Sequence, residues 1–214
     1  MGTHHATDVH SVTTLSLLGG ELCLDFTNTL DPREGKHVHD FINSYTDLAE
    51  WSGYTNIFHE DEVNILLQEA ASHPQDANRV LQRALALRED IYRVFYALAH
   101  QHTPTSADLD QLRDVYIEGI AHAHIVVTTD GFAWDWHPQN LALDSMLWPV
   151  IRSAMDLLTS ERASKVKECP GLNDCGWLFL DTSKNGTRHW CSMEGCGSRA
   201  KMRRQYARKR GIAR

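Results

Sequence analysis

Long apolar runs are absent from this 214-residue sequence, and so are the common signatures of catalysis. No stretch approaches the roughly 18 consecutive apolar residues that a membrane-spanning helix needs. The G-x-G-x-x-G fingerprint, the phosphate-cradling P-loop, the G-x-S-x-G elbow and the H-E-x-x-H motif are all missing. The N-terminus also lacks the basic segment that begins a secretory signal. We therefore expect a cytoplasmic protein with no membrane partner, no enzymatic activity and reduced thiols.

Cysteine is scarce along most of the chain and concentrated near its end. Four of the five cysteines form two close pairs, Cys169/Cys175 and Cys191/Cys196, separated by 15 residues. Two loops that each supply two thiolates are typical of a structural zinc site, so we predict one structural Zn²⁺ held by these four cysteines. Disulfides would need an oxidising compartment, and a redox dithiol usually shows C-x-x-C spacing, which neither pair has. Iron bound by the same four cysteines stays open as an alternative to zinc. His189, close to Cys191 in the sequence, is an alternative ligand.

Positive charge is sparse over the first three quarters of the chain. Residues 1–159 contain 8 Lys/Arg and 23 Asp/Glu, a net charge of −15, whereas residues 160–214 contain 13 Lys/Arg and 5 Asp/Glu, a net charge of +8. An acidic body with a basic tail favours contact with nucleic acid or another polyanion. The simpler alternatives are a solvated basic helix, or a tail that docks on its own acidic body.

Apolar periodicity in the body is mainly helical, with apolar residues recurring at three- and four-residue steps. Ser44 and Ser106 are placed to cap two of the helices, and Pro149 should kink a third or mark the end of its first turn. The run 22–30 is compatible with either a half-buried strand or a short helix. We predict helices over 44–54, 59–73, 76–102, 105–123 and 143–168.

One segment of the body departs from this periodicity. Its valines and threonines, the turn pair Asp130-Gly131 and two alternating tryptophans predict a small β-hairpin over 124–138. The expected fold is therefore mainly α. A helical N-terminal domain with a small β-hairpin, residues 1–162, precedes a small four-cysteine zinc finger, residues 163–214.

The cysteine-rich segment has its own predicted elements. Two strand-like runs flank Asn185-Gly186, the strongest short signal for a β-hairpin, between the two cysteine pairs. A basic helix follows the last cysteine, with Ser198 placed to cap it and Gly211 to end it. The expected finger is thus a β-hairpin plus a basic helix.

The segment CGWLFLDTSKNGTRHWCSMEGCGSRAKMRRQYAR resembles the CGNR zinc finger, a C-terminal module of bacterial proteins regarded as transcription regulators. The signature stands here as CGSR, residues 196–199, with Ser198 in place of asparagine, and the resemblance covers about residues 165–210. The segments GGELCLDFTNTLD, LAEW and ALREDIYRVFYAL are similar to the ABATE domain that usually precedes this finger. The resemblance implies a stress-linked or metabolite-responsive regulator that binds DNA.

The residues after the last cysteine favour the same partner. On a helix these basic side chains would cover most of the circumference, leaving Met202 and Tyr206 to pack on the finger. Such a helix fits a DNA major groove about 12 Å wide, with further backbone contacts from the predicted hairpin. RNA and non-specific binding by a basic tail stay open as alternatives. The predicted contacts to double-stranded DNA are Lys184, Arg188, Arg199, Lys201, Arg203, Arg204 and Arg208.

The acidic body is the expected sensor of a small-molecule effector. Asp25 and Asn28 are polar residues in an apolar run, and Trp51 could floor an apolar pocket, so these three are candidate ligand contacts. The alternative is that they are buried for structural reasons. A small metal-dependent enzyme that uses paired histidines such as His122 and His124 is a further alternative, with the finger as an anchor. A homodimer is also expected, because paired half-sites raise specificity.

Overall fold

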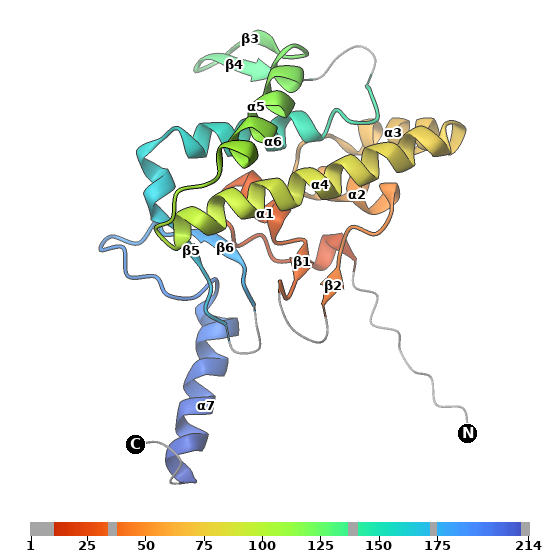
Figure 1. Ribbon diagram of the computed structural model, residues 1–214. Helices are drawn as coiled ribbons and strands as arrows, with labels where there is room; N and C mark the ends of the chain where they lie inside the picture. The colour runs from red at the N-terminus through yellow and green to blue at the C-terminus, as the bar shows by residue number, and fades with distance from the viewer. Residues whose placement is uncertain (1–10, 34–37, 137–140, 172–174, 211–214) are drawn as a thin grey trace, which may run out of the picture.

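The computed structural model describes residues 11–33, 38–136, 141–171 and 175–210. Its axis is helix α4 (Pro74–Ala99), which crosses the middle of the molecule (Figure 1). Pro74 occupies the first helical position, where its missing N–H costs nothing. Within the described residues, no helix has the length and apolar character needed to cross a membrane. The buried stripe of α4 follows the predicted periodicity and contains Leu81, Ala84, Leu87, Ile91, Val94 and Phe95.

The other body helices pack around α4 and around one another, and α6 lies between α1 and α5. Each of the predicted helices is present, but the one predicted over 143–168 is shorter: α6 covers 147–158, and the prediction of helix over 159–168 is wrong because the chain there forms a short turn and then a strand. The ambiguous run 22–30 resolves as a short helix, because three of its apolar residues are buried together on one face. The bounds are α1 (Leu22–Thr27), α2 (Tyr45–Tyr54), α3 (Glu60–Ser72), α5 (Ser106–Ile120) and α6 (Leu147–Leu158).

The first residues of the helices test the caps that the sequence predicted. Ser44 caps α2 in a capping box with Asp47, as predicted. Helix α5 is capped by Thr105 and not by Ser106, whose backbone is already helical. Pro149 lies in the first turn of α6, where a missing N–H is tolerated.

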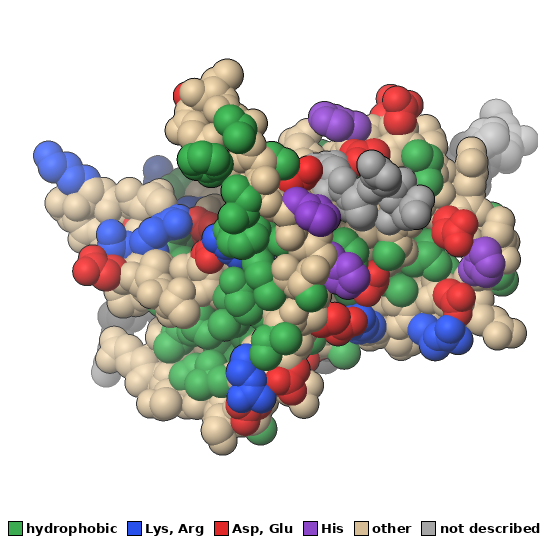
Figure 2. All heavy atoms as spheres, turned by 90° about the horizontal axis from the view of Figure 1, so that it is seen from above, with side chains coloured by type: hydrophobic (Ala, Val, Ile, Leu, Met, Phe, Trp, Pro, Cys, Tyr) green, Lys and Arg blue, Asp and Glu red, His purple; other side chains and the backbone are tan. Residues whose placement is uncertain are grey.

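The predicted body hairpin is confirmed as strands β3 (His124–Thr128) and β4 (Gly131–Asp135). The Trp136 side chain anchors it by donating from Nε1 to the Gly119 carbonyl of α5, 3.2 Å away. Apolar and acidic side chains both appear on the face that carries this hairpin (Figure 2). Cross-strand neighbours on one side of the hairpin are exposed apolar residues: Ile125, Val127, Phe132 and Trp134.

The structure has two further two-stranded antiparallel sheets, one in the body and one in the finger. Strand β1 (Leu30–Asp31) pairs with β2 (His39–Asp40), and β5 (Val166–Glu168) pairs with β6 (Leu178–Leu180). The finger therefore contains a two-stranded sheet, but its position differs from the prediction. The partner of β6 precedes the first cysteine pair instead of following Asn185-Gly186. Short helical turns η1 (Val12–Thr14), η2 (Glu161–Lys165) and η3 (Met193–Gly197), the last of them π-helical, complete the described elements.

A buried ion pair explains why the residues after β6 turn instead of forming a second strand. The Asp181 carboxylate accepts from the amides of Ser183 and Arg188, and from Lys167 Nζ at 2.6 Å. Lys167 also donates to the Gly186 carbonyl at 2.6 Å. Burial alone would raise the pKa of Asp181, but Lys167 and Ser183 together lower it below its ordinary value. The chain is thus held in a turn around Asp181.

One hydrophobic core runs from the body into the cysteine-rich segment. Strand β6 is buried along its whole length and packs on α1 and α4. The four clustered cysteines belong to the same core as Leu24 and Phe26 of α1. The expected boundary between residues 162 and 163 is therefore crossed by continuous packing, and its use as a domain limit stays a prediction.

Candidate metal centre and nucleic-acid interface

The four clustered cysteines come in two pairs from two segments of the chain and meet at one point. Cys169 follows β5, Cys175 precedes β6, Cys191 lies in the loop after the turn, and Cys196 lies in η3. Their sulfurs all lie within 4.8 Å of one another and all four residues are buried. The Sγ–Sγ distances are 3.8 Å from Cys175 to Cys191 and 3.7 Å from Cys191 to Cys196. These residues are positioned to bind one metal ion.

The distances fit the size of a zinc site. Zinc bound tetrahedrally by thiolates at about 2.3 Å places neighbouring sulfurs about 3.8 Å apart. Within the described residues this is also the one group of three or more possible ligands. All four ligand positions come from the protein, so the ion has a structural role and no position is left for a reacting water.

The electrostatics of the cluster also call for a cation. Hydrogen bonds from Cys175 and Cys191 lower the pKa of Cys169, whereas hydrogen bonds with Cys169 and Cys191, followed by burial, raise the pKa of Cys175. The Arg199 guanidinium donates to Cys196 Sγ at 3.2 Å and brings one positive charge. Four thiolates would need more positive charge than that, which a divalent ion supplies.

Two glycines allow the first ligand pair to approach closely. A Cβ at Gly171 would lie 2.2 Å from the Cys175 Cβ. Gly176 has φ of +62°, and a Cβ there would lie 2.7 Å from the Arg33 Cβ. A larger residue at either position would displace the loop that carries Cys175.

The same loop is bound directly to the body. The Arg33 amide donates to the Cys175 carbonyl at 3.0 Å, and the Tyr92 hydroxyl donates to the Gly176 carbonyl at 3.3 Å. The Arg33 guanidinium lies 3.8 Å from the centre of the Tyr92 ring and pairs with Glu89 at 2.7 Å. Helix α4 therefore helps to position the metal centre.

Asn28, one of the predicted ligand contacts, joins α1 to β6. Its Nδ2 donates to the Leu178 carbonyl at 2.9 Å, and its Oδ1 accepts from the Leu178 amide at 3.0 Å. The side chain is 1% exposed and replaces the partner that the edge of β6 would otherwise lack. The structure therefore gives Asn28 the buried, hydrogen-bonded role that the sequence left open as the alternative.

The side chains of the other two candidate ligand contacts also have partners within the protein. The Asp25 carboxylate accepts from the Gly19 amide at 2.7 Å, and burial raises its pKa from 3.8 to about 6. Trp51 is fully buried, with its ring 5.0 Å from that of Phe26. A ligand-binding role for Asp25, Asn28 or Trp51 stays a prediction.

The paired histidines make separate contacts. His122 stacks on Trp148 with ring centroids 4.2 Å apart. His100 Nε2 lies 3.1 Å from the Glu168 carboxylate, and Glu168 directly precedes the metal ligand Cys169. Neither His122 nor His124 belongs to a group of three possible ligands in the part of the chain that is described.

Arg188 was predicted to contact DNA, but in the structure its guanidinium already has partners within the protein. Its guanidinium lies 4.4 Å from the centre of the Phe179 ring and is directed into the protein. It donates to carbonyls on both sides of the body–finger junction, so the structure gives it a role in joining the two parts, and a contact to DNA stays a prediction. The sequence holds no local signal that separates it from the exposed Lys184 nearby. The accepting carbonyls are those of Leu18, Leu180, Trp190 and Cys191.

The start of helix α7 (Ser198–Lys209) also differs from the prediction. Ser198 does not cap it, because η3 runs into it without a break and the Ser198 hydroxyl donates to the Met193 carbonyl at 3.1 Å. The cap belongs one turn earlier, where the Ser192 side chain accepts from the Gly195 amide at 3.1 Å. Gly211, the predicted end, lies outside the described residues.

Helix α7 extends away from the rest of the molecule (Figure 1). Ala200 is its one buried residue. Met202 and Tyr206, predicted to pack on the finger, are 61% and 62% exposed. The helix needs no apolar face of its own, because the metal centre and η3 hold its first turn. Its basic side chains are all exposed: Arg199, Lys201, Arg203, Arg204, Arg208 and Lys209.

Comparison with known proteins agrees with this arrangement. Residues 20–161 match the family model ABATE, whose description is "Putative stress-induced transcription regulator", and residues 165–209 match the model of the CGNR zinc finger. No curated protein matches the chain. Both matches confirm the resemblance found in the sequence, and the ABATE match covers more than half of the chain.

Proposed function

Because the chain belongs to the ABATE family and carries a CGNR zinc finger, we propose that it is a transcription regulator that binds double-stranded DNA through α7. One observation carries the proposal. A buried four-cysteine metal site holds the first turn of a helix that has six Lys/Arg, no Asp or Glu, and its basic side chains exposed.

The charge distribution supports this orientation toward DNA. The acidic body repels a polyanion, whereas the projecting helix attracts it, so the molecule would approach DNA with α7 foremost. A helix of this size fits the major groove, where arginines can contact guanine edges and phosphates. The remaining candidate contacts are all exposed: Lys184, Arg199, Lys201, Arg203, Arg204 and Arg208.

The body would regulate this binding in response to a small-molecule effector or stress signal in the cytoplasm. Its route to the finger consists of the contacts of Arg33, Tyr92 and Asn28 with the loop and strand that carry the metal site. An effector that binds more tightly to one arrangement of these contacts than to another would shift the orientation of α7. Two copies in a homodimer would place two such helices on neighbouring half-sites.

The proposal is tested by measuring the anisotropy of a labelled random duplex with the full-length, zinc-loaded protein. Affinity should fall steeply as salt rises from about 50 to 200 mM, because each phosphate contact releases condensed counterions. Competition with unlabelled RNA of the same sequence tests the RNA alternative. Absence of duplex binding at the lowest salt, or a preference for RNA over the duplex, would overturn the proposal.

A further inference from the structure

Helix α7 has two opposite faces with different surroundings. At 100° per residue, Lys201, Arg204 and Arg208 lie on one face. Arg203 and Arg210 lie close to the opposite direction, with Met202 and Tyr206 beside them. The two faces carry similar charge, so composition alone does not distinguish them.

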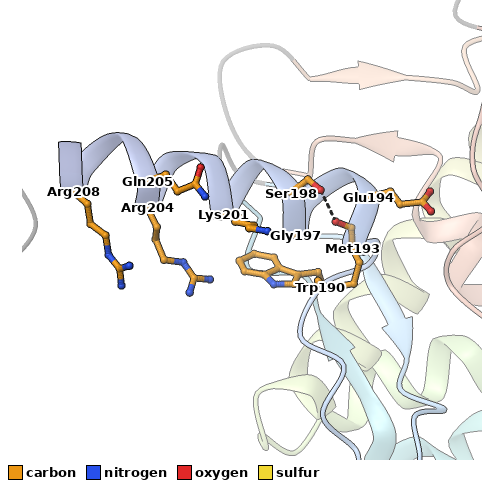
Figure 3. A pocket seen from close by; sticks show the side chains of 9 residues that line it. All are labelled: Trp190, Met193, Glu194, Gly197, Ser198, Lys201, Arg204, Gln205 and Arg208. Atoms are coloured by element: carbon orange, nitrogen blue, oxygen red, sulfur yellow. Dashed lines mark hydrogen bonds between the residues drawn. The ribbon is translucent and has the colours of Figure 1, made fainter. Parts of the chain in front are cut away.

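The first face borders a groove of about 640 Å³ (Figure 3). Trp190 and Met193 form its wall near the start of the helix, and the three basic residues follow along its length. Arg204 and Arg208 point to the same side of the helix as the Trp190 ring in this view. Glu194 also lines the groove, near the start of the helix. The groove therefore combines an aromatic wall with three cations and one carboxylate.

Gly197 allows this wall to form. A Cβ at Gly197 would lie 3.0 Å from the Met193 sulfur and 3.3 Å from Trp190 Cδ1. The indole therefore packs directly against the backbone where the metal-binding turn becomes α7. Because Cys196 is the adjacent residue, the metal centre fixes the wall relative to the helix.

The opposite face is arranged differently. The Arg210 guanidinium lies 4.9 Å from the centre of the Tyr206 ring, so its charge is partly engaged within the helix. Arg199, on the same side, donates to Cys196. The first face differs because its three cations, Lys201, Arg204 and Arg208, all line one groove.

A groove of this kind suits a single extended strand and not the full width of a duplex. A DNA strand alternates charged phosphates with apolar sugar surfaces, which match the cations and the indole. We propose that the groove holds the sugar–phosphate backbone of one strand of duplex DNA, with phosphates at Lys201, Arg204 and Arg208 and a deoxyribose against Trp190. This inference rests on the proposed function and assigns its principal contact face.

Two double variants with equal charge loss test the assignment in the full-length, zinc-loaded protein. Arg204→Gln with Arg208→Gln removes two charges from the groove, and Lys209→Gln with Arg210→Gln removes two charges from residues that do not line it. All four side chains are exposed, so both variants should fold. Loss of two phosphate contacts should reduce the salt slope of duplex binding by about 1.8.

We expect the groove variant to lose roughly 30-fold in duplex affinity at moderate salt together with that slope, since two phosphate contacts are lost. The control variant should lose under about 5-fold with little change in slope, because only long-range attraction is reduced. Equal losses in both variants would overturn the face assignment while leaving DNA binding intact. Failure of the unmodified protein to bind duplex would instead overturn the proposed function, and this inference with it.

A second comparison tests the kind of strand. Trp190→Leu keeps an apolar wall but removes the ring on which an unpaired base would stack. If the groove holds the backbone of a duplex strand, the variant should weaken duplex and single-stranded DNA by similar factors, with duplex bound more tightly throughout. Tighter binding of single-stranded DNA that Trp190→Leu abolishes would identify a base-stacking site and overturn the inference.

Discussion

The segment that gathers the cysteines and the helix that follows it both carry basic side chains, but they use these charges in opposite ways. Around the cysteines, Lys167 of β5 and Arg188 after the turn are bound to carbonyls and to a buried carboxylate, and they hold the finger together. In α7, residues such as Arg204 are exposed and aligned along a groove. The comparison shows that position in the fold, and not residue type, separates structural cations from those available to a ligand.

Removal of the metal should have the largest effect, because it would break the loops and leave the helix without its anchor. Cys191→Ser should lose the ion and duplex binding, since structural zinc sites contribute apparent binding free energies of about 10–16 kcal/mol. Metal content and anisotropy measure the two losses. Cys23→Ser is the control: Cys23 is buried outside the cluster, so this variant should retain its metal.

A pair of arginine variants tests the comparison most sharply. Arg188→Gln leaves several carbonyls poorly satisfied and should cost about 3 kcal/mol of folding free energy. For a protein of this size, that loss lowers Tm by about 10 °C. Arg204→Gln should leave Tm unchanged and weaken duplex binding. Thermal unfolding and anisotropy of both variants check this, and a normal Tm in Arg188→Gln would contradict the structural role.

Asn28→Ala tests whether the contact between α1 of the body and β6 of the finger stabilises the protein. The substitution leaves the Leu178 amide and carbonyl buried without partners, which should cost about 2–4 kcal/mol. Urea denaturation of the zinc-loaded protein measures the loss. Thr46→Ala, on the exposed surface of α2, is a control that should change the midpoint little.

Asp25 gives a smaller, pH-dependent test at the loop that Arg188 and β6 both contact. Its pKa is raised from 3.8 to about 6, so the folded state binds its proton more tightly than the unfolded state. Ionisation therefore reduces stability as pH rises through about 6, by up to about 3 kcal/mol. Asp25→Asn should remove this penalty and stabilise the protein more at pH 7.5 than at pH 5.5.

Denaturation midpoints of the Asp25→Asn variant and the unmodified protein at both pH values check that prediction. Zinc content should be measured in parallel, so that the comparison is restricted to loaded protein. A stability difference that does not change between the two pH values would mean that Asp25 is not the titrating group.

Cysteine spacing and helical periodicity were sufficient for much of this account, because both signals are local. The four clustered cysteines and most of the body helices followed from them, and the N-cap at Ser44 followed from its residue type. The partner of β6 did not, because Val166–Glu168 is too short and too polar to stand out as a strand. The exposure of Met202 and Tyr206 was missed because an apolar pair four residues apart normally indicates a packed face, whereas the metal centre here makes one unnecessary.

The central claim is that the metal centre holds α7 in the orientation that binds DNA. Its most direct test is duplex affinity measured while zinc is removed by a chelator and then restored in steps. The account predicts that binding is lost with the metal and returns in proportion to occupancy, reaching its full value at one ion per chain. Unchanged affinity in the zinc-free protein would contradict it.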